Sequence, residues 1–208
     1  MGDFCGAVSR PEQNGSAESI VDSQDRNRIV RLRELIRDVP NFPSPGIVFK
    51  DITPLLASPA ALALSVEYLT QPFRHLHVDL VAGAESRGFI FGAAVAMQLS
   101  AGFVPIRKSG RLPAETNAEE YALEYGTDRV EIHRDSIESG DRVVMVDDLL
   151  ATGGTMAACC RLVQALGGEI VGVSVLIELG FLNGRSQLPG IPLHAILRYD
   201  SDAVSAGV

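Results

Sequence analysis

The chain has 208 residues, a formal net charge of −8, and 46% hydrophobic against 21% charged residues. This length and composition suit one compact domain with a sizeable core. The acidic balance argues against broad affinity for nucleic acid or anionic membranes, because both reward clustered Lys and Arg side chains. The chain has no tryptophan, so Val, Leu, Ile and Ala must fill most of the core, as they do in parallel sheets covered by helices.

The first 24 residues are polar, small and without a hydrophobic period, which predicts a disordered leader. This leader has no apolar core of the kind that a signal peptide carries. No apolar run in the chain approaches the roughly 20 residues that span a bilayer. We therefore expect a cytoplasmic protein that does not enter a membrane, with a single domain over residues 25–208.

The domain is predicted to begin with a helix, because apolar residues recur at helical spacing from residue 25 onward. These residues are Ile29, Leu32, Leu35, Ile36 and Val39. The next stretch, residues 39–56, contains four prolines, which end the helix and favour a stiff, extended course. Ser58 and Pro59 then have the pattern of a capping residue followed by a helix-starting proline.

Strand and helix patterns alternate after this point. The predicted strands are residues 78–83, 103–108, 142–148, 169–179 and 192–199, and the predicted helices are residues 85–102 and 153–168. This alternation predicts an α/β fold with a mainly parallel, twisted sheet that is flanked by helices on both faces.

One polar segment interrupts the alternation between two buried strands. Residues 108–141 are charged and rich in turns, and the stretches YALEYG (121–126) and RVEIHRD (129–135) can pair as an antiparallel flap. Long excursions inside a compact α/β domain are usually functional lids or disordered segments. Because aliphatic and aromatic residues continue through this one, we favour a lid, the flap of residues 108–135.

The stretch VVMVDDLLATGGT, residues 143–155, carries the strongest chemical signal. A buried strand delivers Asp147 and Asp148 to its carboxyl end, where open parallel sheets bind ligands. A turn of small residues then leads into a helix, and its free backbone N–H groups can cradle a phosphate. This turn consists of Ala151, Thr152, Gly153, Gly154 and Thr155. Two carboxylates beside a phosphate cradle suit a ribose 5-phosphate better than a triphosphate tail.

Three cations are candidates for a pyrophosphate site. Arg87 begins a helix after a strand, and its fork of donors suits pyrophosphate oxygens; the alternative is a surface salt bridge with Glu85. Lys108 and Arg111 flank a glycine at the root of the lid and can swing onto the same group. For these two residues, solvated surface charge is an equally good interpretation of the sequence alone.

Phe49 and Glu124 are candidates for contact with a base, and each also has a simpler structural interpretation. Phe49 lies in the extended segment GIVFKD and can stack on a purine, although a structural role explains it equally well. Glu124 lies on the flap between Leu123 and Tyr125. A carboxylate that closes into a dry site can exchange a proton with a ring nitrogen, whereas in an open hairpin it would be a solvated charge.

Taken together, these segments resemble a known family. VVMVDDLLATGGT resembles the phosphoribosyl pyrophosphate (PRPP) signature of the type I phosphoribosyltransferases. Residues 42–56, 82–92, 106–113 and 121–126 resemble the adenine phosphoribosyltransferase family in order and spacing. The resemblance runs from about residue 29 to residue 199. The chain departs from it in its long leader and in Lys50, where some members have arginine.

The resemblance implies a reaction, in which adenine and PRPP give AMP and pyrophosphate through an oxocarbenium-like transition state. It implies that Val48 and Lys50 lie at the adenine and that Phe49 stacks beneath it, within a base-binding hood over residues 25–57. It makes Glu124 the catalytic group. It implies Mg²⁺ carried by PRPP and water rather than by protein ligands, and a homodimer.

Two alternatives remain at this stage. The base could be a 6-oxopurine, although a site that reads a 6-amino group should reject it by leaving a buried polar group unpaired. The chain could also be a non-catalytic regulator that binds PRPP. Such regulators need a DNA-binding module, which neither the acidic leader nor the net charge suggests.

Overall fold

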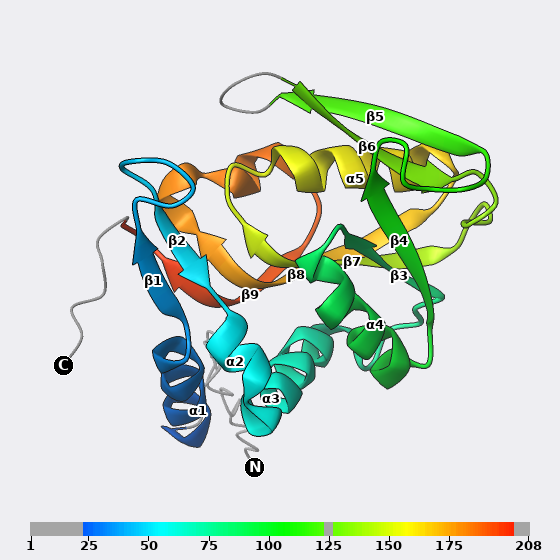
Figure 1. Cartoon of the computed structure of the whole chain (residues 1–208). Coiled ribbons are helices and arrows are strands. Elements are labelled where there is room, and N and C mark those ends of the chain that lie inside the picture. Colours follow the sequence, from blue (N-terminus) through cyan, green and yellow to red (C-terminus); the bar gives the residue numbers. More distant parts are fainter. Residues whose placement is uncertain (1–22, 123–126, 202–208) are drawn as a thin grey trace, which may run out of the picture.

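A seven-stranded sheet lies at the centre of the computed structural model, which describes residues 23–122 and 127–201 (Figure 1). Its strands lie side by side in the order β5-β6-β4-β3-β7-β8-β9. Their bounds are β3 (Leu80–Ala84), β4 (Gly102–Lys108), β5 (Thr116–Ala122), β6 (Thr127–His133), β7 (Arg142–Leu150), β8 (Glu169–Leu179) and β9 (Leu193–Tyr199).

Five neighbouring strands of this sheet are parallel, from β4 through β3, β7 and β8 to β9. β6 pairs with β4 and β5 with β6, both antiparallel. Two core clusters cover the two faces, and β7 supplies both because its side chains alternate. Val143 and Met145 belong to the cluster that includes residues of α5, whereas Val144 and Val146 belong to the cluster with α3 and α4. The mainly parallel α/β fold is confirmed.

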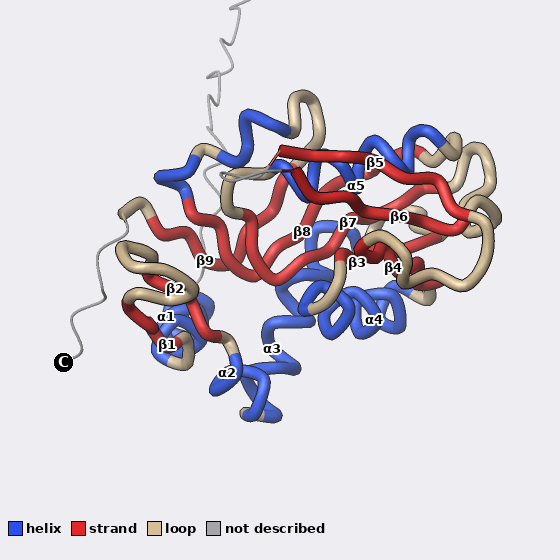
Figure 2. Tube along the Cα trace, turned by 45° about the horizontal axis from the view of Figure 1, so that its top comes forward, coloured by secondary structure: helices blue, strands red, loops and turns tan. Residues whose placement is uncertain are grey.

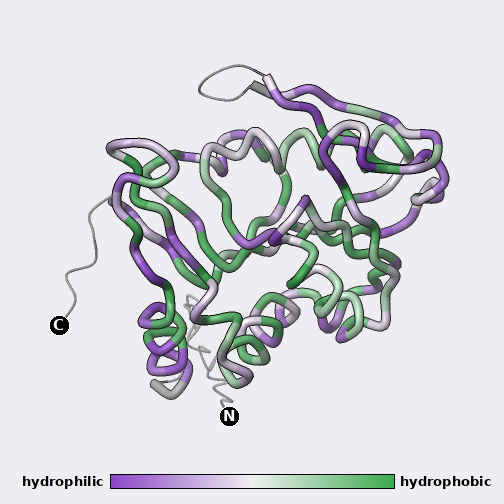
Figure 3. The backbone as a smooth tube through the Cα atoms, viewed as in Figure 1, coloured by the Kyte–Doolittle hydropathy of each residue, from purple (hydrophilic) through white to green (hydrophobic). Residues whose placement is uncertain are grey.

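Helices flank both faces of the sheet (Figure 2). α3 (Pro59–Thr70) and α4 (Arg87–Leu99) lie on one face, and α5 (Gly154–Ala165) lies on the other. α3 begins as its sequence predicts, because the Ser58 side chain accepts a hydrogen bond from the backbone N–H of Ala61. In α5 the cysteines Cys159 and Cys160 are buried and free. Hydrophobic residues follow the central strands, whereas hydrophilic residues dominate much of the β5–β6 hairpin (Figure 3).

The N-terminal part forms a separate small layer beside β9. α1 (Ser23–Glu34) leads into β1 (Arg37–Pro40), β2 (Val48–Asp51) and α2 (Thr53–Ala57), and β1 pairs with β2 in an antiparallel ribbon. The predicted helical stripe was wrong at its end, because Val39 lies in β1 and pairs with Phe49. Pro40 explains the difference, since a residue before proline is disfavoured in helical conformation.

Strand β7 is longer than its sequence predicts. It continues to Leu150, so that Asp147 and Asp148 lie within the strand rather than at its end. The extension is held by the neighbouring strand, because Leu149 pairs with Ile177 and Leu150 with Glu178 of β8. A pairing partner in another part of the chain therefore adds two residues that the local sequence pattern does not assign to the strand.

The predicted antiparallel flap is the β5–β6 hairpin. Its pairing begins at Thr116 with His133, earlier in the chain than the segment YALEYG, and ends at Ala122 with Thr127. The hairpin joins the sheet only where Arg107 and Lys108 of β4 pair with β6. Positions 123–126, Glu124 among them, and the leader up to residue 22 lie outside the described residues.

The short helical turns η1 (Gln71–Phe73), η2 (Gly180–Leu182) and η3 (Gly184–Gln187) complete the described chain. None of the helices within the described residues is both long and apolar enough to cross a membrane.

Candidate active site

A cavity of about 410 Å³ opens where the carboxyl ends of β3, β4 and β7 meet the end of the β5–β6 hairpin that is close to its turn. Its walls combine acidic, basic and backbone groups from five separate stretches of the chain. The lining residues are Glu85, Ser86, Arg87, Lys108, Tyr121, Asp128 and the continuous run from Asp147 to Met156. The structure thus brings together most of the residues that the sequence predicts for the PRPP site.

The turn from Ala151 to Thr155, which we call the phosphate loop, forms one wall. It ends where α5 begins at Gly154, so the unpaired N–H groups of a helix start face the cavity. Gly153 has φ +85°, which side-chain-bearing residues rarely adopt. A Cβ on Gly153 would also lie only 2.3 Å from the carbonyl oxygen of Gly184. The turn at Gly184 thus supports the loop, a contact the sequence analysis missed.

The two aspartates of β7 have different surroundings. Asp148 is 4% exposed and accepts a charge-assisted hydrogen bond from Nε of Arg87. Asp147 is half-buried and accepts a 2.8 Å hydrogen bond from the backbone N–H of Asp148. Burial, followed by the neighbouring Asp148 carboxylate, raises the pKa of Asp147 well above its usual range.

The N-terminus of α4 approaches Asp147 closely. A Cβ on Gly88 would lie 2.8 Å from Oδ1 of Asp147 and 3.1 Å from the carbonyl oxygen of Val146, so a larger residue would displace the Asp147 carboxylate. The partial positive charge of a helix start stabilises a nearby carboxylate. Arg87, one residue earlier, therefore reaches Asp148 while Gly88 lets the helix lie against Asp147.

Glu85 organises the other predicted cations. Its carboxylate accepts hydrogen bonds from Nη1 of Arg111 at 2.7 Å, from Nε of Arg107 at 3.2 Å and from the backbone N–H of Lys108 at 3.1 Å. The alternative pair between Arg87 and Glu85 is not the one that forms, because Arg87 pairs with Asp148. Arg111 lies outside the cavity lining, and Glu85 holds its guanidinium at the root of the flap.

The flap contributes two residues to the cavity that the sequence analysis did not single out. Asp128 forms an ion pair with Nζ of Lys108 at 3.2 Å and accepts a 3.1 Å hydrogen bond from the Tyr121 hydroxyl. The backbone N–H of Arg129 is the main cause that lowers the pKa of Asp128. Burial raises the pKa of Tyr121. The position of Tyr121 at the start of YALEYG was the available signal.

The predicted base-binding residues lie on β2, beside the cavity rather than in its lining. The ring of Phe49 lies 5.3 Å from Cζ of Arg87 and makes an edge-on contact with Phe42, with 5.2 Å between ring centroids. Lys50 is 3% exposed, and its Nζ lies 2.6 Å from Oδ1 of Asp38. Its ammonium group is therefore engaged inside the protein, which leaves its backbone to contact a ligand.

Within residues 23–122 and 127–201, no cluster of three or more His, Cys, Asp or Glu side chains could hold a metal ion. The carboxylates nearest to the cavity are matched with donors instead, Asp148 with Arg87 and Asp128 with Lys108.

Comparison with known proteins gives consistent matches. The family model described as "Phosphoribosyl transferase domain" matches residues 51–188. The adenine phosphoribosyltransferase of Thermobifida fusca is 56% identical over 161 residues, which are 77% of this chain and 92% of the relative. That of Cyanothece sp. is 55% identical over 81% of this chain and 99% of its own.

Solved structures agree with these relatives. The crystal structure of adenine phosphoribosyltransferase from Rhodothermus marinus has a TM-score of 0.81 and 52% identity, and it covers 84% of this chain and 99% of its own. The enzyme from Saccharomyces cerevisiae, complexed with an imino-altritol bisphosphate and adenine, has a TM-score of 0.79 and 38% identity, over 83% of this chain and 99% of its own.

Proposed function

The chain belongs to the phosphoribosyl transferase family, and we infer from this membership and from the cavity that it is an adenine phosphoribosyltransferase. It transfers the 5-phosphoribosyl group of PRPP to N9 of adenine and gives AMP and pyrophosphate. The observation that supports this function is one cavity whose lining includes two strand aspartates, a glycine-rich helix start, Arg87 and Lys108.

The aspartates and the phosphate loop hold the sugar at both ends. Asp147 and Asp148 accept hydrogen bonds from the ribose hydroxyls, and the N–H groups of the loop, residues 151–155, hold the 5-phosphate. Anchoring both ends positions the anomeric carbon, and such positioning can supply several kcal/mol of a barrier. The same carboxylates stabilise the positive charge that develops on the sugar as the leaving group departs.

Arg87 and Lys108 receive the pyrophosphate. The guanidinium of Arg87 offers donors beyond the one engaged by Asp148, and Lys108 can exchange its surface partner Asp128 for a phosphate oxygen. Arg111 would also bind the pyrophosphate if its guanidinium exchanged the Glu85 carboxylate for a phosphate oxygen. Mg²⁺, bound to PRPP and water rather than to protein side chains, would supply further charge neutralisation on the leaving group.

The base lies between the hood and the cavity. Phe49 stacks on the purine, and the backbone groups of Val48 and Lys50 read its edge. The contact between Phe49 and Arg87 brings this surface to the edge of the cavity. Glu124, on the flap, exchanges the proton of the purine ring, and the flap excludes water that would hydrolyse PRPP.

We also propose a domain organisation, a cellular location and an oligomeric state for the enzyme. Residues 25–208 form one catalytic domain after a leader of residues 1–24, and residues 108–135 act as the flap. The enzyme works in the cytoplasm as a homodimer. Its partners are adenine and PRPP as substrates and AMP and pyrophosphate as products, with no role for nucleic acid or membranes.

A turnover assay tests the function directly. Purified protein receives PRPP and Mg²⁺ with adenine, hypoxanthine, guanine or xanthine, each offered separately. Product from adenine alone is expected, with turnover largely lost in Glu124→Gln and in the Asp147→Asn, Asp148→Asn double variant. Glu169→Gln is the matched control, because Glu169 is an exposed carboxylate at the opposite end of the sheet.

Each other outcome has a definite meaning. Turnover of a 6-oxopurine would show that the hood reads a different base. PRPP binding without product from any base would establish a regulator instead of an enzyme. Full activity of Glu124→Gln would remove that residue from catalysis while leaving the rest of the proposal in place.

A further inference from the structure

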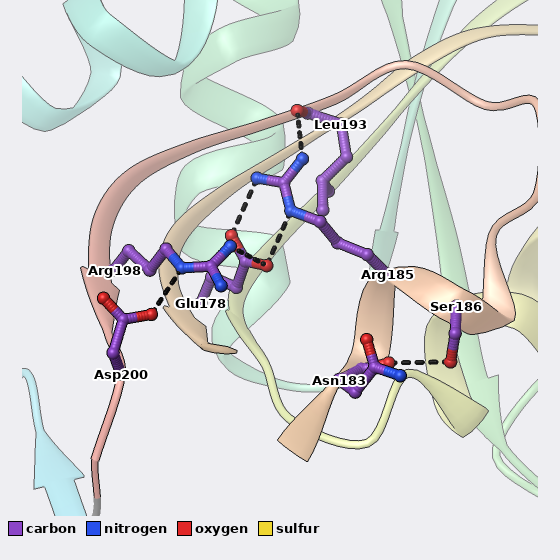
Figure 4. A network of polar contacts seen from close by, with 7 residues as sticks. All are labelled: Glu178, Asn183, Arg185, Ser186, Leu193, Arg198 and Asp200. Atoms are coloured by element: carbon purple, nitrogen blue, oxygen red, sulfur yellow. Dashed lines mark hydrogen bonds and ion pairs between the residues drawn. The ribbon is translucent and has the colours of Figure 1, made fainter. Parts of the chain in front are cut away.

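Glu178 is a buried carboxylate that the proposed mechanism does not use. It lies near the end of β8, opposite Leu150 of β7, and only 2% of it is exposed. Nε and Nη2 of Arg185 donate to its two oxygens at 2.6 and 2.7 Å, and Nη1 of Arg198 lies at 3.3 Å (Figure 4). Burying a charge costs free energy even when the charge is paired. Holding a surface turn in place does not by itself explain why the chain buries this carboxylate.

That turn is the one that supports the phosphate loop. Arg185 lies in η3, directly after Gly184. A Cβ on Gly184 would lie 2.2 Å from the carbonyl oxygen of Ala151, and a Cβ on Gly153 would lie 2.3 Å from the carbonyl oxygen of Gly184. The backbones of loop and turn therefore pack directly against each other, and a shift of the turn must shift the loop.

The guanidinium of Arg185 fixes this turn from two sides. Besides its paired bonds to Glu178 on β8, it donates from Nη1 to the carbonyl oxygen of Leu193 at the start of β9, at 3.2 Å. Paired arginine–carboxylate bonds define direction as well as distance. The turn is thus tied to two strands of the sheet, and the phosphate loop lies against the turn.

We propose that Glu178, acting through Arg185, is a positioning residue for the 5-phosphate of PRPP. It fixes the position of η3 against the phosphate loop, and this contact fixes the position of the N–H groups that bind the 5-phosphate. This inference rests on the proposed function, because it takes PRPP as the ligand of that loop. It predicts an effect on PRPP rather than on adenine, since Glu178 lies on β8 and Arg185 on η3, whereas residues 48–50 lie on β2.

The first test separates PRPP from adenine. Arg185→Met should raise KM and the equilibrium Kd for PRPP by about tenfold or more, because small displacements of positioning groups weaken a site strongly. KM for adenine should stay within about twofold. Arg185→Lys keeps the charge but loses the paired geometry, so its Kd for PRPP should lie between that of wild type and that of Arg185→Met.

The matched control shares the same carboxylate. Arg198 also contacts Glu178 but lies on β9, and its own guanidinium is held by Asp200 at 2.7 Å. Arg198→Met should therefore leave Kd for PRPP unchanged. An equal rise in Kd for both arginine variants would overturn the proposal, as would an unchanged Kd in Arg185→Met.

A double-mutant cycle shows whether Glu178 acts through Arg185. Glu178→Gln should weaken PRPP binding as Arg185→Met does, and the double variant should be no weaker than the weaker single one. Additive losses would mean that Glu178 acts by another route. If Glu178→Gln does not fold, Arg185→Met and Arg185→Lys still test the ion pair, and Gly184→Ala tests the packing of the turn against the phosphate loop, where it should raise Kd for PRPP.

The wild-type protein distinguishes this inference from the function beneath it. Wild type that fails to bind PRPP contradicts the proposed function. Wild type that binds PRPP, with folded variants that bind it equally well, contradicts only the positioning role of Glu178.

Discussion

The two ends of the candidate site are built in different ways. The phosphate end comes from one continuous stretch, residues 147–156, and presents mainly backbone groups and two carboxylates. The hood, residues 25–57, depends on contacts among α1, β1, β2 and the neighbouring β9, because Lys50 pairs with Asp38 and both Lys50 and Arg33 lie over the ring of Tyr199. A local sequence motif can specify the first arrangement but not the second.

The difference also separates two uses of charge. At the phosphate end, charged groups face a cavity and are available to a ligand. In the hood, Lys50 is 3% exposed, and its ammonium group pairs with Asp38 instead of facing the cavity. Arg87 contacts both ends, through Asp148 on one side and the ring of Phe49 on the other.

The largest effect is expected where the two ends meet. Arg87→Met removes a donor to the leaving group and leaves Asp148 buried without its cation, so kcat/KM should fall by about 100- to 1000-fold. Steady-state kinetics with adenine and PRPP measure it. Arg74→Met serves as control, because Arg74 is an exposed residue with a 4.0 Å ion pair to Glu67. A loss in kcat/KM below tenfold would contradict a role for Arg87 at both ends of the site.

The hood should respond mainly in stability. Lys50→Met leaves Asp38 in place without its buried lysine partner, and breaking a buried pair destabilises by about 3 kcal/mol or more. Urea denaturation measures this change. Lys50→Arg retains a cation and should lose less. A stable Lys50→Met protein would show that the charge of Lys50 is not structural.

The phosphate end should respond through its backbone. Gly153→Ala meets both a positive φ and the carbonyl oxygen of Gly184, so we expect a loss of about 2–3 kcal/mol in unfolding free energy and weaker PRPP binding. Gly140→Ala is the matched control, because Gly140 has φ +94° with nothing within 4 Å of its Cβ position. Equal losses in the two variants would mean that the contact with Gly184 does not matter.

The smallest effect concerns Asp147, whose pKa is raised by burial. A carboxyl group with a higher pKa in the folded than in the unfolded state binds its proton more tightly when folded, so stability falls as pH rises from about 4 through the folded pKa. Asp147→Asn removes this loss. Its Tm should exceed that of wild type by about 2–4 °C at neutral pH, although activity falls.

Thermal scans at several pH values check this sign. The difference in Tm between Asp147→Asn and wild type should shrink toward zero as pH falls below about 4, where Asp147 is protonated in both states. A difference that stays constant with pH would point to packing rather than to ionisation.

How far the sequence predicts the molecule follows from the same contrast. The hydrophobic run and the glycines of residues 143–155 predict both the strand and the loop, because strand and loop are local properties of that stretch. The extra length of β7, by contrast, depends on the pairing of Leu150 with Glu178. The support of the phosphate loop by Gly184 likewise joins distant parts of the chain. Contacts of this kind leave no local pattern.

The hood shows the same limit. The family resemblance implies that Lys50 lies at the adenine, but the sequence does not show that its side chain contacts Asp38 and Tyr199. Polar alternation in Thr116–Ala122 is too weak a signal to mark a strand, and only its partner β6 makes it one.

The buried cysteines of α5 make thiol labelling a measure of how often this helix opens. Burial raises the pKa of Cys160 to about 12 and that of Cys159 well above its usual range, and both residues are buried, so we expect neither thiol to react with an alkylating reagent while the helix is packed. Labelling at these two positions therefore requires opening of α5, the helix whose start forms part of the phosphate loop. The labelling rate reports how often that loop comes apart, and a ligand that occupies it should slow the reaction.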